Sequence, residues 1–184
     1  MLVHGNGFAV GGGAAERVRV ELDARGGLPG FALIGLAGAP ARDARERVQA
    51  AVLNSGFAFP RKRLTANLAS GSAPRSGPAF DLVLACCVLA VQDEFDPERL
   101  GAIGLFAELG LGGDLRACPS VSAVTQAAAA AGLSGLVVAQ ADLREAHAIG
   151  ALPVAGLPSL AAVATLLRAR PAGGRPRGGR AVVA

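Results

Sequence analysis

A change in the spacing of apolar residues is the feature of this sequence that most constrains its fold. In the segment ERVRVELD (16–23), every second residue from Val18 to Leu22 is apolar and its neighbours are mostly charged. This two-residue period is typical of a half-buried strand. Residues 39–57 instead place apolar residues three and four positions apart, which is the period of an amphipathic helix. The sequence therefore predicts a domain that combines strands and helices.

Turn residues and shorter patterns predict the other elements. The glycines at 11–13 fit a hairpin between the first two strands, and the apolar run within residues 27–36 fits a buried strand. Gly56 is a natural stop for the first helix. Together the elements predict an α/β fold, with helices packed on a mixed sheet. The remaining expected elements are a strand at 64–68, a loop at 69–78, a helix at 79–92, a connector at 95–100, a hairpin from 103–111 through Gly112-Gly113, a helix at 120–132, a strand at 136–139, and helices at 142–150 and 157–170.

The basic charge of the chain is concentrated at its C-terminal end. The formal net charge is +4, but residues 168–184 hold five arginines and no acidic residue. The remaining residues hold 13 basic and 14 acidic side chains, so their net charge is near −1. We therefore interpret residues 1–167 as one folded domain and residues 168–184 as a flexible tail rich in Arg, Gly and Pro.

Several classes of site lack their sequence signature. The single lysine, Lys62, has none of the glycines of a phosphate-binding Walker loop around it, and His4 and His147 have no ligand-spaced partners. The adjacent Cys86 and Cys87 fit small core residues in a reducing compartment. We expect no catalytic residue, nucleotide site, metal, cofactor or small-molecule substrate. The four acidic residues near Pro97 are interpreted as a solvated surface: Asp93, Glu94, Asp96 and Glu98.

The sequence also lacks a signal for membrane insertion or secretion. The N-terminal residues have no basic head followed by a sustained apolar segment. The longest stretch without charge, residues 117–141, is interrupted by polar residues and Pro119. We therefore expect a cytoplasmic protein with no membrane contact.

Two basic segments are candidates for contact with nucleic acid. Arg61, Lys62 and Arg63 follow Pro60 and precede an expected strand, where they could neutralise phosphates or simply keep the start of the strand solvated. The RPRGGR segment of the tail has the same two interpretations, because Arg-Gly segments bind single strands weakly and without sequence preference.

The segment RSGPAFDLVLACC (75–87) predicts a helix start. Gly77 and Pro78 form a turn, and proline is tolerated in the first turn of a helix. Asp81 lies in the same turn, where a carboxylate interacts favourably with the helix dipole and accepts hydrogen bonds from exposed amides. We identify Gly77, Pro78 and Asp81 as a structural motif.

Four segments in this order carry a family resemblance: GLPGFALIGLAG, ARERVQAAVLNSGFAFPRKRLTANLA, SGPAFDLVLACCVLA and FAELGLGGDLRA. Over about residues 15–167 the chain resembles the N-terminal domain of the magnesium-chelatase-like ComM family, also called YifB. The resemblance implies the fold of the Lon proteolytic domain. It also implies a role in a hexameric AAA+ motor that acts on DNA in branch migration during natural transformation. The ATPase module of that family is absent from the present sequence.

The chain departs from the family pattern at several polar positions. Ala37-Gly38 replaces a Pro-Asp pair, Ser70-Gly71-Ser72 replaces Ala-Asp-Leu, Arg75-Ser76 replaces Lys-Glu, and Gly112 replaces an aspartate. A divergent copy of the domain would show such changes.

The resemblance to Lon also tests for peptidase chemistry. Lon-type proteases carry a nucleophilic serine at a Gly-Pro turn and a lysine base in a later helix. Here the nucleophile position holds Ala79, and residues 119–131 contain no lysine. We therefore expect a noncatalytic domain for assembly or DNA contact, which would self-associate or join a full-length AAA+ relative. The alternatives are a relict Ser hydrolase using Ser72 or Ser76, and a free-standing regulatory fragment.

Overall fold

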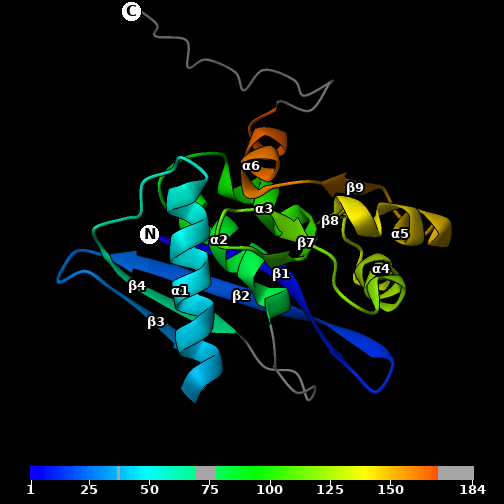
Figure 1. Ribbon diagram of the computed structural model, residues 1–184, viewed down its shortest axis with the longest axis horizontal. Coiled ribbons are helices and arrows are strands. Elements are labelled where there is room, and N and C mark those ends of the chain that lie inside the picture. The colour runs from blue at the N-terminus through cyan, green and yellow to red at the C-terminus, as the bar shows by residue number, and fades with distance from the viewer. Residues whose placement is uncertain (37, 69–77, 170–184) are drawn as a thin grey trace, which may run out of the picture.

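The computed structural model describes residues 1–36, 38–68 and 78–169, which form a seven-stranded sheet with helices on both of its faces (Figure 1). The strand order is β3-β4-β2-β1-β5-β8-β9. The strands are β1 (Leu2–Gly11), β2 (Ala14–Arg25), β3 (Gly30–Ile34), β4 (Arg63–Leu68), β5 (Gly104–Phe106), β8 (Leu136–Ala139) and β9 (Val154–Leu157). A separate hairpin consists of β6 (Glu108–Leu109) and β7 (Leu115–Arg116).

The helices are α1 (Gly38–Asn54), α2 (Asp81–Ala90), α3 (Pro97–Ala102), α4 (Val121–Ala130), α5 (Leu143–Ile149) and α6 (Leu160–Arg168), with 3-10 turns at η1 (Pro78–Phe80) and η2 (Gln140–Asp142). In the sheet, β2 is antiparallel to both of its neighbours, and the other paired strands run parallel. The predicted α/β class with a mixed sheet is therefore confirmed.

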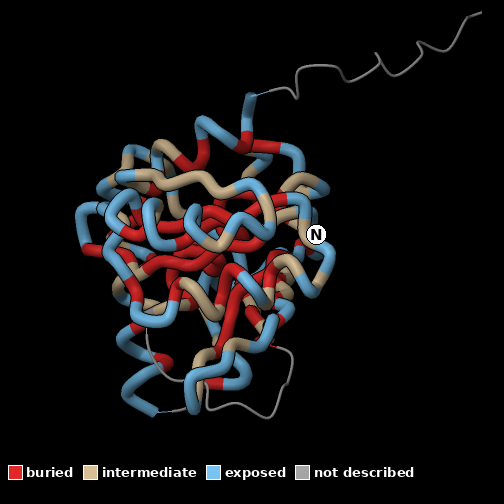
Figure 2. The backbone as a smooth tube through the Cα atoms, turned by 90° about the vertical axis from the view of Figure 1, so that its right-hand side faces the viewer, coloured by how far each residue is buried: buried red, intermediate tan, exposed pale blue. Residues whose placement is uncertain are grey.

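The alternation of apolar and charged residues in β2 determines which face of the sheet packs in the larger core. Val18, Val20 and Leu22 are buried, whereas Arg17 and Arg19 are exposed. Burial of this apolar set supplies the main driving force for docking the helices. The larger core packs the inner residues of β2 and β4 against α1, α2 and α6. A smaller core on the opposite face packs β5 and β8 against α4 and α5. Figure 2 shows the buried segments gathered in the interior of the molecule.

Helix α2 is the centre of the larger core, and all of its residues from Asp81 to Ala90 are buried. It approaches β1 closely because Gly5 and Gly7 of that strand carry no side chain. A Cβ atom on Gly5 would lie 2.8 Å from a Val83 side-chain carbon, and one on Gly7 would lie 3.0 Å from another carbon of the same side chain. These glycines therefore make room for a helix.

The predicted stop of α1 is confirmed, and α6 begins with a side-chain cap. Helix α1 stops at Gly56, whose φ of 84° lies in the left-handed region and whose amide donates to Leu53 O. Helix α6 starts at Ser159, whose Oγ accepts from the amide of Ala162 at 3.3 Å. Arg168, placed by sequence in the tail, is the last residue of α6, and its Nε donates to Glu94 O at 3.0 Å.

Four details differ from the sequence-based predictions. Strand β3, expected to be buried, is an edge strand with alternating exposed and half-buried residues, because it pairs with β4 alone. The expected connector contains α3, whose first turn is capped by Asp96. Strand β5 lies in the main sheet, and β6–β7 alone form the hairpin. Strand β9 was not predicted, since its four residues include Gly156 and are too few to show a period.

No helix in the described parts of the chain is long and apolar enough to cross a membrane.

Candidate functional site

The predicted helix start lies at the beginning of α2, next to residues 69–77, which are outside the described part of the chain. Gly77 falls outside the described residues, as do Ser72 and Ser76, and the 3-10 turn η1 begins at Pro78. Ala79, at the position of the Lon nucleophile, is half-buried and packs against the smaller core. Its methyl group has neither a nucleophilic atom nor a proton to transfer.

Asp81 lies in the first turn of α2, as predicted, and it forms a bidentate ion pair that the sequence did not predict. Arg47 of α1 donates from Nε to Oδ2 at 2.6 Å and from Nη2 to Oδ1 at 3.2 Å. The Asp81 side chain is fully buried and that of Arg47 is 27% exposed. Bidentate guanidinium–carboxylate geometry is the strong form of this contact. The pair therefore joins the middle of α1 to the start of α2.

Burial dominates the electrostatics of this pair. The pKa of Asp81 is raised from 3.8 to about 6, chiefly because burial disfavours the carboxylate. The hydrogen bond and the charge of Arg47 oppose this rise, and the nearby Glu108 adds to it. The hydrogen bond with Asp81 in turn raises the pKa of Arg47. The guanidinium of Arg47 and the carboxylate of Asp81 therefore bind one another.

The thiols near this site are poor nucleophiles. Cys86, Cys87 and Cys118 are all buried, which confirms the prediction of Cys86 and Cys87 as core residues. Burial raises the pKa of Cys87 and of Cys118 to about 12, and raises the pKa of Cys86 as well. The backbone amide of Cys118 donates to Asp142 Oδ2 at 3.0 Å, so the carboxylate of Asp142 accepts a hydrogen bond from the backbone.

The NSGF segment (54–57) positions the β6–β7 hairpin. Asn54 Nδ2 donates to Leu111 O at 2.8 Å. A Cβ atom on Gly113 would lie 2.1 Å from Ser55 Oγ, so only glycine allows this approach at a φ of 84°. The hairpin also donates from Leu115 N to Pro158 O at 2.9 Å. This segment, on which the family resemblance depends, therefore has a structural role.

The predicted basic group is exposed at the start of β4. Arg61 and Lys62 lie in a bend, and Arg63 is the first residue of the strand. In the described part of the chain, none of the three forms an ion pair. The sheet register places Arg25 of β2 opposite Arg63. Sequence reasoning missed Arg25 because only strand pairing brings it beside the basic group.

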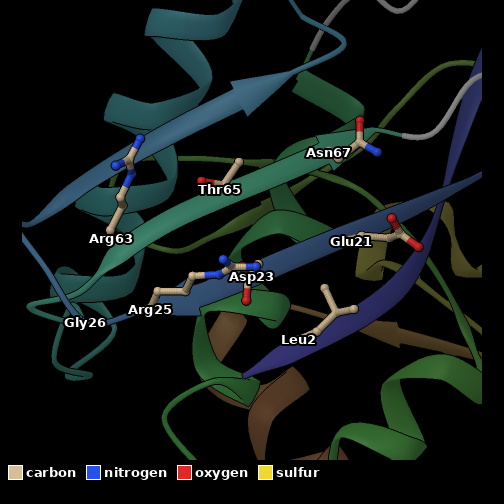
Figure 3. A pocket seen from close by; sticks show the side chains of 8 residues that line it. All are labelled: Leu2, Glu21, Asp23, Arg25, Gly26, Arg63, Thr65 and Asn67. Carbon is tan, nitrogen blue, oxygen red and sulfur yellow. The ribbon is translucent and has the colours of Figure 1, made fainter.

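Arg25 and Arg63 border a hollow of about 680 Å³ on the sheet face away from α2 (Figure 3). Arg25 is directed along β2 towards Asp23, with which it forms an ion pair. The hollow is lined by Leu2, Glu21, Asp23, Arg25, Gly26, Arg63, Thr65 and Asn67. Over the described residues, no group of three or more His, Cys, Asp or Glu side chains is arranged to hold a metal ion.

Comparison with known proteins identifies the family of the chain. The family model for subunit ChlI of Mg-chelatase matches residues 20–142. An uncharacterized protein of Mycobacterium bovis is 37% identical over 160 residues, which cover 87% of this chain and 32% of that protein. The uncharacterized protein YifB of Salmonella typhimurium is 38% identical over 114 residues, or 61% of this chain and 22% of the relative.

A third relative is competence protein ComM of Haemophilus influenzae, which is 37% identical over 137 residues. That match covers 73% of this chain and 26% of the relative. The chain thus spans about a third or less of the length of the curated relatives it matches. The chain belongs to the ChlI family of Mg-chelatase-like proteins, as a domain of the ComM/YifB type.

Proposed function

We propose that this chain is a noncatalytic N-terminal domain of a ComM-type protein, which serves in assembly or in contact with DNA, in a process linked to branch migration and natural transformation. The proposal that the domain is noncatalytic rests on the residues at the start of α2. Its one carboxylate, Asp81, is fully buried and bound by Arg47, and the position of the Lon nucleophile holds Ala79. Neither residue offers a free nucleophile or base to a substrate.

Two observations support the DNA-contact part. Arg61, Lys62 and Arg63 are exposed cations on one short segment, and no carboxylate in the described part pairs with them. Lys and Arg side chains of this kind bind phosphates and release counterions from nucleic acid. One relative bears the name competence protein, which agrees with a role in natural transformation.

The noncatalytic part is tested by activity assays on the purified chain. We expect no hydrolysis of unstructured peptide substrates, no labelling by a serine-directed fluorophosphonate, and no ATP turnover. Labelling that is lost in an S76A or S72A variant would instead support the relict hydrolase. ATP turnover that copurifies with the chain through successive columns would contradict the proposal.

The DNA-contact part is tested by fluorescence anisotropy of a labelled duplex across a salt series. We expect an R61Q/K62Q/R63Q variant to bind more weakly, with a shallower dependence of log K on log salt, by about 0.9 for each lost phosphate contact. The matched control R42Q/R116Q/R144Q removes the same charge from exposed positions on α1, β7 and α5.

A second control separates the tail from the domain. An R170Q/R175Q/R177Q/R180Q variant removes tail charge and leaves the described residues unchanged. Binding that is lost in this variant and kept in R61Q/K62Q/R63Q would contradict contact through the domain.

A further inference from the structure

On the side of the sheet that holds β2 and β4, the helices of the described residues leave the face away from α2 largely uncovered. The residues of β2 whose side chains alternate with its core residues are exposed or half-buried: Arg17, Arg19, Glu21, Asp23 and Arg25. Helix α4 contacts β2 on this face, and Ala15 near the start of that strand packs against the smaller core. On β4, Arg63, Thr65 and Asn67 continue the same face. We call these eight residues of β2 and β4 the open face.

The open face carries a charge opposite to that of the rest of the domain. It holds four arginines and two carboxylates, and Arg61 and Lys62 directly precede it, which gives a net charge of +4. Residues 1–167 together are near −1, so the remainder of the domain is negative. This separation of charge creates a local positive potential in a domain that is otherwise slightly acidic.

Both carboxylates of the open face are already paired along their own strand. Glu21 pairs with Arg19 at 3.4 Å, and Asp23 pairs with Arg25. In the described part, Arg17 and Arg63 form no ion pair. The free cations therefore lie at the two ends of the face, with neutral pairs between them.

The spacing of these free cations fits an extended polyanion. Arg63 lies opposite Arg25, and Arg17 lies eight residues earlier on β2. At about 3.4 Å per residue, the two ends are roughly 27 Å apart. That length corresponds to about eight steps of 3.4 Å along one strand of a duplex. A single duplex can thus contact both ends and cover the hollow between them.

The open face has no aromatic side chain on which a nucleic-acid base could stack. The chain has no Trp or Tyr, and on the neighbouring strands Phe8 is buried in the smaller core and Phe31 packs against the larger one. Proteins that hold single strands rely on aromatic stacking platforms, which this face lacks. Binding here would come from phosphates, whose density is greatest on a duplex.

We propose that the open face binds the phosphate backbone of duplex nucleic acid without sequence preference, with Arg17 and Arg63 as contacts at its two ends. This inference rests on the proposed DNA-contact function. It adds the surface, the preference for a duplex, and contacts outside the basic group 61–63.

The test is a set of single variants of the full chain, titrated with a labelled random-sequence duplex at several salt concentrations. We expect R17Q to reduce the slope of log K against log salt by about 0.9, and R63Q to do the same. The control R42Q, on the helix-covered side, keeps the wild-type slope. A single strand of the same length should bind more weakly, with a slope of about 0.7 for each contact.

A gain of binding provides a test that misfolding cannot imitate. E21Q releases Arg19 and D23N releases Arg25 from their ion pairs. Each variant should bind the duplex more tightly than wild type at low salt, with a slope steeper by about 0.9.

The outcomes separate this inference from the proposed function. If R61Q/K62Q/R63Q loses affinity while R17Q, E21Q and D23N match wild type, the proposal that the open face binds the duplex is wrong, and the proposed DNA contact through the basic group is supported. If the wild-type chain binds no nucleic acid at any salt concentration, the proposed DNA-contact function and the proposed role of the open face are both wrong. Binding to vesicles of anionic phospholipid without binding to the duplex would also overturn the inference.

Discussion

Two Arg–Asp pairs of this protein have the same chemistry and opposite environments. Arg47 and Asp81 join two helices inside the larger core, where the carboxylate is fully buried. Arg25 and Asp23 lie on the open face, where the Arg25 side chain is 78% exposed and the Asp23 side chain 27% exposed. The first pair is held by the surrounding protein, and the second competes with water and salt. Residue type alone thus says little about what a charged pair contributes.

The largest difference between the pairs should appear when an arginine is removed. An R47M variant leaves the buried Asp81 without its partner, and should lower the free energy of unfolding by about 3–5 kcal/mol at neutral pH. The matched R25M variant should lower it by less than about 1 kcal/mol. Urea unfolding followed by circular dichroism measures both, and equal losses would contradict the distinction drawn between the pairs.

The second prediction uses the raised pKa of Asp81. Because its pKa is about 6 in the folded protein and 3.8 is its ordinary value, the folded protein holds a proton that the unfolded chain releases between these values. The stability of the wild type should therefore fall as pH rises from about 4 to 6, by roughly 3 kcal/mol from this group.

A D81N variant removes this titration. The difference in unfolding free energy between wild type and D81N, measured in urea at pH values across that window, should decline with pH and then level off. Asp142, whose pKa burial also raises, is present in both proteins and cancels. A difference that stays constant with pH would contradict the buried, proton-binding state of Asp81.

A third prediction concerns a hydrogen bond whose contribution to stability should lie between those of the two ion pairs. Asn54 is an exposed residue, yet its amide donates to Leu111 O and holds the β6–β7 hairpin. An N54A variant should lose about 1 kcal/mol of unfolding free energy, the usual net value of one hydrogen bond. The control N67A, on the open face, removes an amide with no hydrogen bond in the described part and should lose less. Equal losses in the urea titration would show that Asn54 does not hold the hairpin.

The smallest effect is expected for the exposed pair itself. A double-mutant cycle of D23N and R25Q should give a coupling energy of about 0.2–1 kcal/mol at low salt. The coupling should shrink as salt is added, because exposed charges are screened. A coupling that is large and independent of salt would place this pair in the same class as Arg47 and Asp81.

Local patterns predicted much of the fold. The alternation from Val18 to Leu22 identified β2 and its core side, and the three- and four-residue spacing identified α1 with its stop at Gly56. These predictions succeeded because strand and helix periods depend on residues a few positions apart. The edge position of β3 was missed, since an apolar run is the same whether one neighbouring strand covers it or two.

The candidate site was predicted only where its features are local. The position of Asp81 in the first turn of α2 follows from the Gly-Pro turn before it. Its partner Arg47 is 34 positions away on another helix, so no local pattern joins the two residues. Likewise, the basic group 61–63 is visible in the sequence, but its neighbour Arg25 comes from another strand.

The sequence by itself determined the periods of the strands and helices, the family of the chain, and which residues carry charge. The tertiary structure alone decided which charges are buried and which are free. Asp81 became a buried, paired carboxylate because α1 brings Arg47 over the start of α2, whereas Arg17 lies exposed on the open face. The physical reason is desolvation: the cost of a charge depends on the atoms that displace its water, and these come from distant parts of the chain.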